Sequence, residues 1–78
     1  MDRNLFNDIC NRVNPEILEN PDLDLVEEGI LDSLLIMQLV AELEAAFEFD
    51  FDPDDIMPEN FASAEAMEKM LGKYGVKL

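Results

Sequence analysis

With 19 acidic and 5 basic residues among 78, the chain has a formal net charge of −14, which excludes nucleic acid as a direct partner because phosphate binding needs positive charge. The length predicts one small domain over residues 1–78, and the 49% hydrophobic content argues against a disordered acidic tail. The single cysteine cannot form an internal disulfide, and no segment has the pattern of a signal peptide or a membrane span. We therefore expect a cytoplasmic protein.

The first predicted helix covers residues 4–13 and ends at an asparagine–proline pair. Cys10 falls on its apolar face, which favours a core position over a reactive one. The long connection that follows is predicted to contain a short helical turn at residues 16–19. Further along, Leu23 and Leu25 alternate with aspartates, so we expect an extended piece whose two leucines reach the core.

A second helix is predicted to begin at about Ser33 and to continue to Phe47. Gly29 permits the backbone turn before it, and Asp32 and Ser33 are both favourable helix N-caps. Ser33 should therefore lie exposed at a helix N-terminus. There, unpaired N–H groups and the positive end of the helix dipole suit a covalently attached phosphate. A serine that only caps the helix is the simpler alternative.

This second helix is apolar on two sides. One stripe repeats at helical spacing and is expected to be core; its members are Leu35, Ile36, Leu39, Val40, Leu43 and Phe47. The other stripe runs down from Ser33 and consists of Leu34, Met37 and Ala41, with Gln38 between them. A domain of this size buries only about 60% of its unfolded surface, so one helix can hardly bury both stripes. We expect the second stripe to be a docking face for a partner, rimmed by Gln38, Glu44 and Glu48.

After the second helix, three phenylalanines alternate with acidic residues, at Phe47, Phe49 and Phe51. No partner strand exists elsewhere in the sequence, so we favour an extended link that leads to a short helical turn at residues 53–57. Ser63 is predicted to cap a final helix that ends at Gly72. The expected fold is all-α: a small bundle of three main helices and one short helix, with a long first loop.

Two segments of this sequence resemble the prosthetic-group attachment site of acyl carrier proteins. They are Gly29 to Leu34 (GILDSL) and the helix end Leu43 to Phe47 (LEAAF). The likeness extends over most of the chain, and the stretch from residue 21 to 33 is most similar to D-alanyl carrier proteins. The resemblance implies that Ser33 carries 4′-phosphopantetheine through a phosphodiester. It also implies that Asp32 assists recognition by the transferase that installs this group.

The resemblance further implies a role as a carrier of acyl or aminoacyl groups. The cargo would be a thioester on the prosthetic arm, in a fatty-acid, polyketide or D-alanyl pathway. Its partners would be a phosphopantetheinyl transferase, a loading ligase and downstream acyl-transfer enzymes. The interval between Arg12 and Lys69 holds 17 carboxylates and no basic residue, and such a field steers basic protein surfaces toward it. We expect a monomer that does not insert into membranes.

No catalytic function is expected, because the chain has no histidine and no Gly-x-Ser-x-Gly motif that would activate a serine. Asp50, Asp52 and Asp54 alternate as in a calcium-binding loop. However, Asp55 and Phe61 stand where that loop needs glycine and glutamate, so we expect no metal site. The alternative function is that of an acidic helical adaptor without a prosthetic group, which intact mass would distinguish from a carrier.

Overall fold

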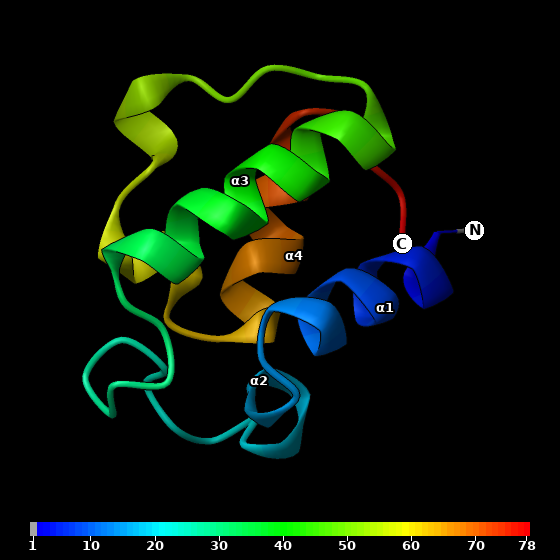
Figure 1. Cartoon of the computed structure of the whole chain (residues 1–78). Coiled ribbons are helices and arrows are strands. Elements are labelled where there is room, and N and C mark those ends of the chain that lie inside the picture. Colours follow the sequence, from blue (N-terminus) through cyan, green and yellow to red (C-terminus); the bar gives the residue numbers. More distant parts are fainter. Residues whose placement is uncertain (1) are drawn as a thin grey trace.

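The computed structural model describes residues 2–78, and this part of the chain contains helices and turns but no strand (Figure 1). Three α-helices of ten or more residues form the bundle: α1 (Arg3–Val13), α3 (Ser33–Phe47) and α4 (Ala64–Lys73). The shorter elements are α2 (Glu16–Glu19) and the 3₁₀ turns η1 (Pro53–Asp55) and η2 (Pro58–Phe61). The predicted all-α fold, with three main helices and a long first loop, is confirmed.

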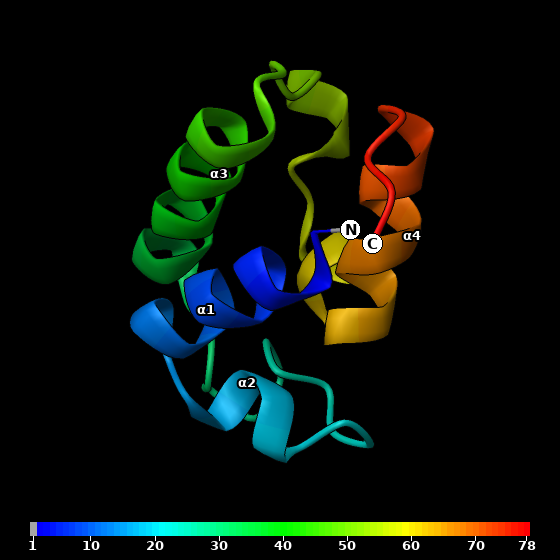
Figure 2. The same ribbon diagram turned by 90° about the vertical axis from the view of Figure 1, so that its right-hand side faces the viewer.

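The helices surround a core that contains apolar side chains only. In Figure 2, α3 and α4 lie on opposite sides of the molecule and α1 lies between them, while the two ends of the described part of the chain are close together. Fully buried side chains come from every long helix, among them Phe6, Ile9, Leu39, Leu43, Met67 and Leu71. Among the described residues no polar or charged residue is buried. Burial of this apolar surface is therefore the main stabilising contribution to the fold.

The N-terminal half largely follows the prediction. The α1 helix begins one residue earlier than expected, and α2 occupies the predicted turn. Cys10 is fully buried in the core, and this burial raises the pKa of its thiol to about 11. The thiol is therefore protonated and unreactive at neutral pH. No helix within residues 2–78 has both the length and the apolar character needed to cross a membrane.

The prediction for Leu23 and Leu25 was only half right. Leu25 is fully buried, and its N–H donates to the carbonyl of Ala62 at 2.7 Å, which ties the first loop to the segment before α4. Leu23, in contrast, is 41% exposed. The reason is that the chain turns at Asn20, whose carbonyl accepts from the Leu23 N–H at 3.3 Å, so the expected extended alternation does not form.

The C-terminal half contains an element that the sequence did not indicate. The predicted turn at residues 53–57 is shorter and ends at Asp55, and η2 follows as a second 3₁₀ turn. Ser63 caps α4 as predicted, with its hydroxyl accepting from the Ala66 N–H at 3.0 Å. The helix continues past Gly72 to Lys73, and the chain turns instead at Gly75, where φ is +81°.

Candidate functional site

Ser33 is the first residue of α3, and its side chain is exposed. The helix is capped by the residue before it, because the Asp32 carboxylate accepts from the Leu35 N–H at 2.9 Å. Capping therefore does not require the Ser33 hydroxyl. The first N–H groups of an α-helix have no intrahelical acceptor and carry the positive end of the dipole. The Ser33 hydroxyl thus lies where an attached phosphate would be stabilised.

Only two serines occur in the chain, and it has no threonine. The hydroxyl of Ser63 is half-buried and caps α4 through its contact with the Ala66 N–H. A bulky ester on Ser63 would disrupt this cap, at a cost of about 1 kcal/mol before any steric effect. The Ser33 side chain, in contrast, is exposed and does not cap its helix. Of the two aliphatic hydroxyls, that of Ser33 is the one that can accept a large substituent without disturbing the fold.

The loop before Ser33 is held from both sides. Gly29 adopts a φ of +75°, which a residue with a side chain rarely adopts, and its N–H donates to the Val26 carbonyl at 3.1 Å. Beyond this turn, the Leu31 side chain is buried and its N–H donates to Leu25 at 3.0 Å. On the other side, the Asn14 side-chain amide donates to the Ile30 carbonyl at 3.1 Å. These contacts fix the entry of the chain into α3.

A pocket of about 250 Å³ opens beside Ser33 between the first loop, α3 and the link from η1 to η2. Its lining is mostly apolar and consists of Val26, Asp32, Ser33, Ile36, Met37, Ile56, Met57 and Pro58. The sequence indicated Asp32, Ser33 and Met37 as site residues, but it placed Ile36 in the core and did not indicate Val26 or the segment from Ile56 to Pro58. These lie in irregular segments, and no periodic pattern marks them as neighbours of Ser33.

The two apolar stripes of α3 occupy the two environments that were expected. Ile36, Leu39, Val40 and Leu43 are buried, and the two end members of the inner stripe, Leu35 and Phe47, are half-buried. In the outer stripe, Leu34 is 77% exposed and Met37 is 52% exposed, and both Ala41 and Gln38 are also exposed. The helix therefore presents a continuous apolar strip to solvent, beginning next to Ser33.

The acidic residues predicted at the rim of this strip differ in environment. The Glu44 carboxylate is half-buried and accepts from the Phe51 N–H at 2.8 Å, so it holds the chain that leaves α3. Glu48 is exposed and lies just beyond the helix, in a left-handed conformation with φ of 57°. The left-handed backbone at the end of α3, and not the helical repeat, therefore determines the direction of the Glu48 side chain.

Four of the five basic side chains belong to α1 and α4, and each forms an ion pair with a carboxylate; they are Arg3, Arg12, Lys69 and Lys73. The fifth, Lys77, follows α4 and lines a surface hollow together with Glu48. No basic residue belongs to α3 or to the loop before Ser33, which carries Asp24, Glu27 and Glu28. The face that includes Ser33 is therefore negative. Within residues 2–78, no group of three His, Cys, Asp or Glu side chains could hold a metal ion.

Comparison with known proteins identifies the family. Residues 3–71 match the family model described as the phosphopantetheine attachment site. This chain belongs to that family. Membership indicates a covalently attached 4′-phosphopantetheine, and the exposed serine at a helix N-terminus beside an apolar pocket fits such a group.

The curated relatives are carrier proteins. The chain is 43% identical to a D-alanyl carrier protein of Lactococcus lactis subsp. cremoris over 49 residues, which are 63% of this chain and 62% of that protein. It is 30% identical to a D-alanyl carrier protein of Bacillus mycoides, over 86% of this chain and 82% of the relative. Aminoacyl carrier protein 1 of Bradyrhizobium diazoefficiens is 39% identical over 65% of this chain and 56% of the relative.

These matches confirm the resemblance to D-alanyl carrier proteins inferred from the sequence. The chain spans about 62% of the length of the first curated relatives it matches. No solved structure matches the chain significantly.

Proposed function

We propose that this chain, as a single carrier domain, transports an aminoacyl group as a thioester on 4′-phosphopantetheine attached to Ser33. The exposed hydroxyl of Ser33 at the start of α3 is the observation that supports the attachment site. The names of the relatives, which are D-alanyl and aminoacyl carrier proteins, favour an amino acid over a fatty-acyl or polyketide cargo. D-alanine is the first candidate.

The residues around Ser33 would hold the prosthetic group in different ways. The N–H groups at the start of α3 would hold the phosphate, and the helix dipole would stabilise its charge. Asp32 keeps these donors in place through its cap on Leu35, and we expect it to assist recognition by the transferase. Val26 and Met57 offer apolar surface beside the serine. When bound, the group supplies a thiol that holds the cargo and raises its local concentration at partner active sites.

The chain itself provides no group for acyl-transfer chemistry. It has no histidine, and the Asp32 carboxylate beside Ser33 is engaged in the helix cap. Attachment, loading and transfer therefore belong to partners: a phosphopantetheinyl transferase, an aminoacyl-loading ligase and a downstream transfer enzyme. The buried free thiol of Cys10 is compatible with a reducing cytoplasm, which is the compartment that we propose.

We propose the exposed stripe of α3 as the docking face for these partners. Leu34 and Met37 provide the apolar contact, Gln38 and Ala41 extend it along the helix, and the surrounding charge is negative. The complementary partner surface is apolar at its centre and basic at its edge. Glu48 and Glu44 contribute to the negative charge at the far end of the stripe, although Glu44 also holds Phe51.

The attachment site is tested by intact mass. The protein is incubated with coenzyme A, Mg²⁺ and a broad-specificity phosphopantetheinyl transferase, and we expect one phosphopantetheine to be added. Ser33→Ala should abolish the addition, whereas the matched variant Ser63→Ala should retain it. A wild-type protein that stays unmodified with several transferases, or a Ser33→Ala variant that is still modified, would contradict the proposal.

The cargo is tested on the modified protein. Loading with ATP and a D-alanine-activating ligase is compared with loading by fatty-acyl ligases, again by intact mass. We expect an aminoacyl adduct that hydroxylamine removes, as it does a thioester. Acceptance of fatty-acyl groups alone would contradict the aminoacyl assignment while leaving the attachment site intact.

A further inference from the structure

One wall of the pocket beside Ser33 is an irregular segment that needs an external support. Ile56, Met57 and Pro58 line the pocket, and all three lie outside the long helices: Ile56 and Met57 connect the two 3₁₀ turns, and Pro58 begins η2. Their own backbone bonds are local: Ile56 N–H donates to Pro53 at 3.1 Å, and Met57 N–H donates to Asp55 at 3.0 Å. Local bonds of this kind shape a turn but do not fix its position relative to α3.

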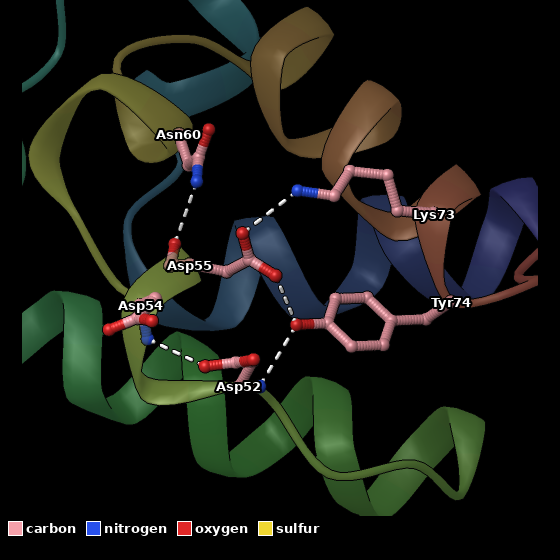
Figure 3. A network of polar contacts seen from close by, with 6 residues as sticks. All are labelled: Asp52, Asp54, Asp55, Asn60, Lys73 and Tyr74. Atoms are coloured by element: carbon pink, nitrogen blue, oxygen red, sulfur yellow. Dashed lines mark hydrogen bonds and ion pairs between the residues drawn. The ribbon is translucent and has the colours of Figure 1, made fainter.

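Ile56 itself packs against the core, and the polar support comes from the end of α4. The Tyr74 hydroxyl donates to one oxygen of the Asp55 carboxylate and accepts from the Asp52 N–H at 2.9 Å (Figure 3). The ammonium group of Lys73 contacts the other Asp55 oxygen at 2.8 Å. The side-chain amide of Asn60, in η2, donates to the Asp55 backbone carbonyl at 2.8 Å. Asp55, immediately before the wall, is therefore joined to η2 and to the end of α4.

The contacts of Asp55 are charge-assisted and partly shielded from water. Asp55 has a side chain only 18% exposed, and hydrogen bonds to an ionised acceptor are stronger than neutral ones. Hydrogen bonds from Lys73 and then Tyr74 hold the pKa of the Asp55 carboxyl below its usual range, and the bond to Asp55 raises the pKa of Tyr74. At neutral pH, Asp55 is therefore ionised and the Tyr74 hydroxyl is protonated.

The ring of Tyr74 has a separate role from its hydroxyl. It packs against Phe49 and Phe51, with ring centroids 4.9 Å and 5.6 Å away. Phe51 also contacts Phe61 of η2, at 6.2 Å between centroids. Replacement of Tyr74 by phenylalanine would keep this aromatic contact and remove only the hydroxyl. The chain thus offers a variant that isolates the polar connection.

We propose that Tyr74 and Asp55 are positioning residues for the carrier site. By linking the end of α4 to the segment before Ile56, they hold the pocket wall next to Ser33 and keep Met57 in place beside the docking face. The role in carrier function rests on the proposed attachment at Ser33; the support of the wall does not. Loss of the Tyr74 hydroxyl should therefore loosen the wall locally and weaken docking of the transferase.

The first measurement is amide hydrogen exchange on the unmodified protein. In Tyr74→Phe we expect the amides of Asp55, Ile56, Met57 and Asn60 to exchange roughly tenfold faster, because one charge-assisted bond is lost. The core amides of α3, such as that of Leu43, should keep their wild-type rates. A merely structural role would instead accelerate exchange throughout the molecule.

The matched control is Glu42→Gln. It removes the carboxylate of the ion pair between Glu42 of α3 and Arg12 of α1, which are 2.7 Å apart. This pair has a similar exposure to that of Asp55 and Lys73 but lies outside the pocket wall.

The second measurement is the rate of phosphopantetheine attachment. We expect Tyr74→Phe to lower kcat/KM by roughly threefold to tenfold, mainly through a higher KM. Glu42→Gln should leave both the exchange of the wall and kcat/KM unchanged.

Local acceleration of exchange together with a higher KM supports the proposal. Unchanged exchange at residues 55–60, uniform acceleration throughout the chain, or local acceleration with wild-type attachment kinetics would each overturn it. Because exchange is measured without the arm, a failure of Ser33 to accept phosphopantetheine would be recognised separately. In that case the wall would still respond to Tyr74→Phe.

Discussion

The two faces of α3 have similar chemistry and opposite surroundings. On the inner face, Leu39 and Leu43 are fully buried against the rest of the bundle. On the outer face, Leu34 and Met37 are 77% and 52% exposed, although they are of similar size and polarity. Hydrophobicity alone therefore does not indicate which residues of this helix stabilise the fold. The outer face is apolar without contributing comparable burial, and the docking role that we propose for it next to Ser33 would account for that composition.

The largest effect should come from a charge on the inner face. Leu39→Asp would bury an unpaired carboxylate in an apolar core and should destabilise the fold by more than about 4 kcal/mol, enough to unfold a domain of this size. Far-ultraviolet circular dichroism should show the loss of helix. If this variant retained a cooperative melting transition near the wild-type temperature, the assignment of the inner face would be wrong.

The same substitution on the outer face should affect partners instead of folding. Met37→Asp should change stability by no more than about 0.5 kcal/mol, as is usual for exposed positions. Removal of an apolar contact next to Ser33 should nevertheless lower kcat/KM for attachment or loading by about tenfold, which corresponds to a loss of about 1.4 kcal/mol. Thermal melting and attachment kinetics measured on one preparation would check both values. Equal destabilisation by Met37→Asp and Leu39→Asp would remove the distinction between the faces.

A third prediction uses pH to separate the apolar core from the polar contacts. The buried face of α3 contains no titratable group, so its contribution to stability should not vary with pH. Asp55 has a lowered pKa in the folded state, chiefly through its hydrogen bond from Lys73. Its contribution is therefore present above the unfolded pKa of about 3.9 and is lost as the pH falls through the lower folded value.

The measurement is the difference in melting temperature between the wild type and Asp55→Asn across a pH series. We expect the wild type to be more stable at pH 7, and the difference to shrink as the pH falls below about 4. Comparing the two proteins cancels the effect of neutralising the other carboxylates. A difference that is constant down to pH 2 would indicate that the charge of Asp55 is not the stabilising group.

The smallest effect should come from salt. With a net charge of −14, repulsion between carboxylates opposes folding and exposed charges are screened by ions. Added NaCl, or millimolar Mg²⁺ or Ca²⁺, should raise the melting temperature by a few degrees. The same salt should slow association with a basic transferase. A melting temperature that falls or stays flat across the salt series would contradict the role of repulsion.

The bounds of α3 and its two apolar stripes could be predicted from the sequence, because they depend on helical periodicity and on residues within one turn. The sequence left the cap open between Asp32 and Ser33, and the structure assigns it to Asp32. The pocket wall and the contact between Asp55 and Tyr74 could not be predicted. They join segments 19 residues apart, and neither segment has a repeat that specifies its partner. The prediction that Leu23 reaches the core was wrong for a related reason, since a turn at Asn20 replaces the expected extended backbone.

The central claim is that the prosthetic arm is attached to Ser33. It is tested most directly by digesting the modified wild-type protein and locating the added group by tandem mass spectrometry. Ser33 and Ser63 are the two serines that could accept it, and they fall in separate peptides when the chain is cut after Glu, because Glu42, Glu44, Glu48 and Glu59 lie between them. We predict phosphopantetheine on the peptide that contains Ser33 and an unmodified peptide that contains Ser63. A modified Ser63, or an arm on any residue other than Ser33, would contradict the account.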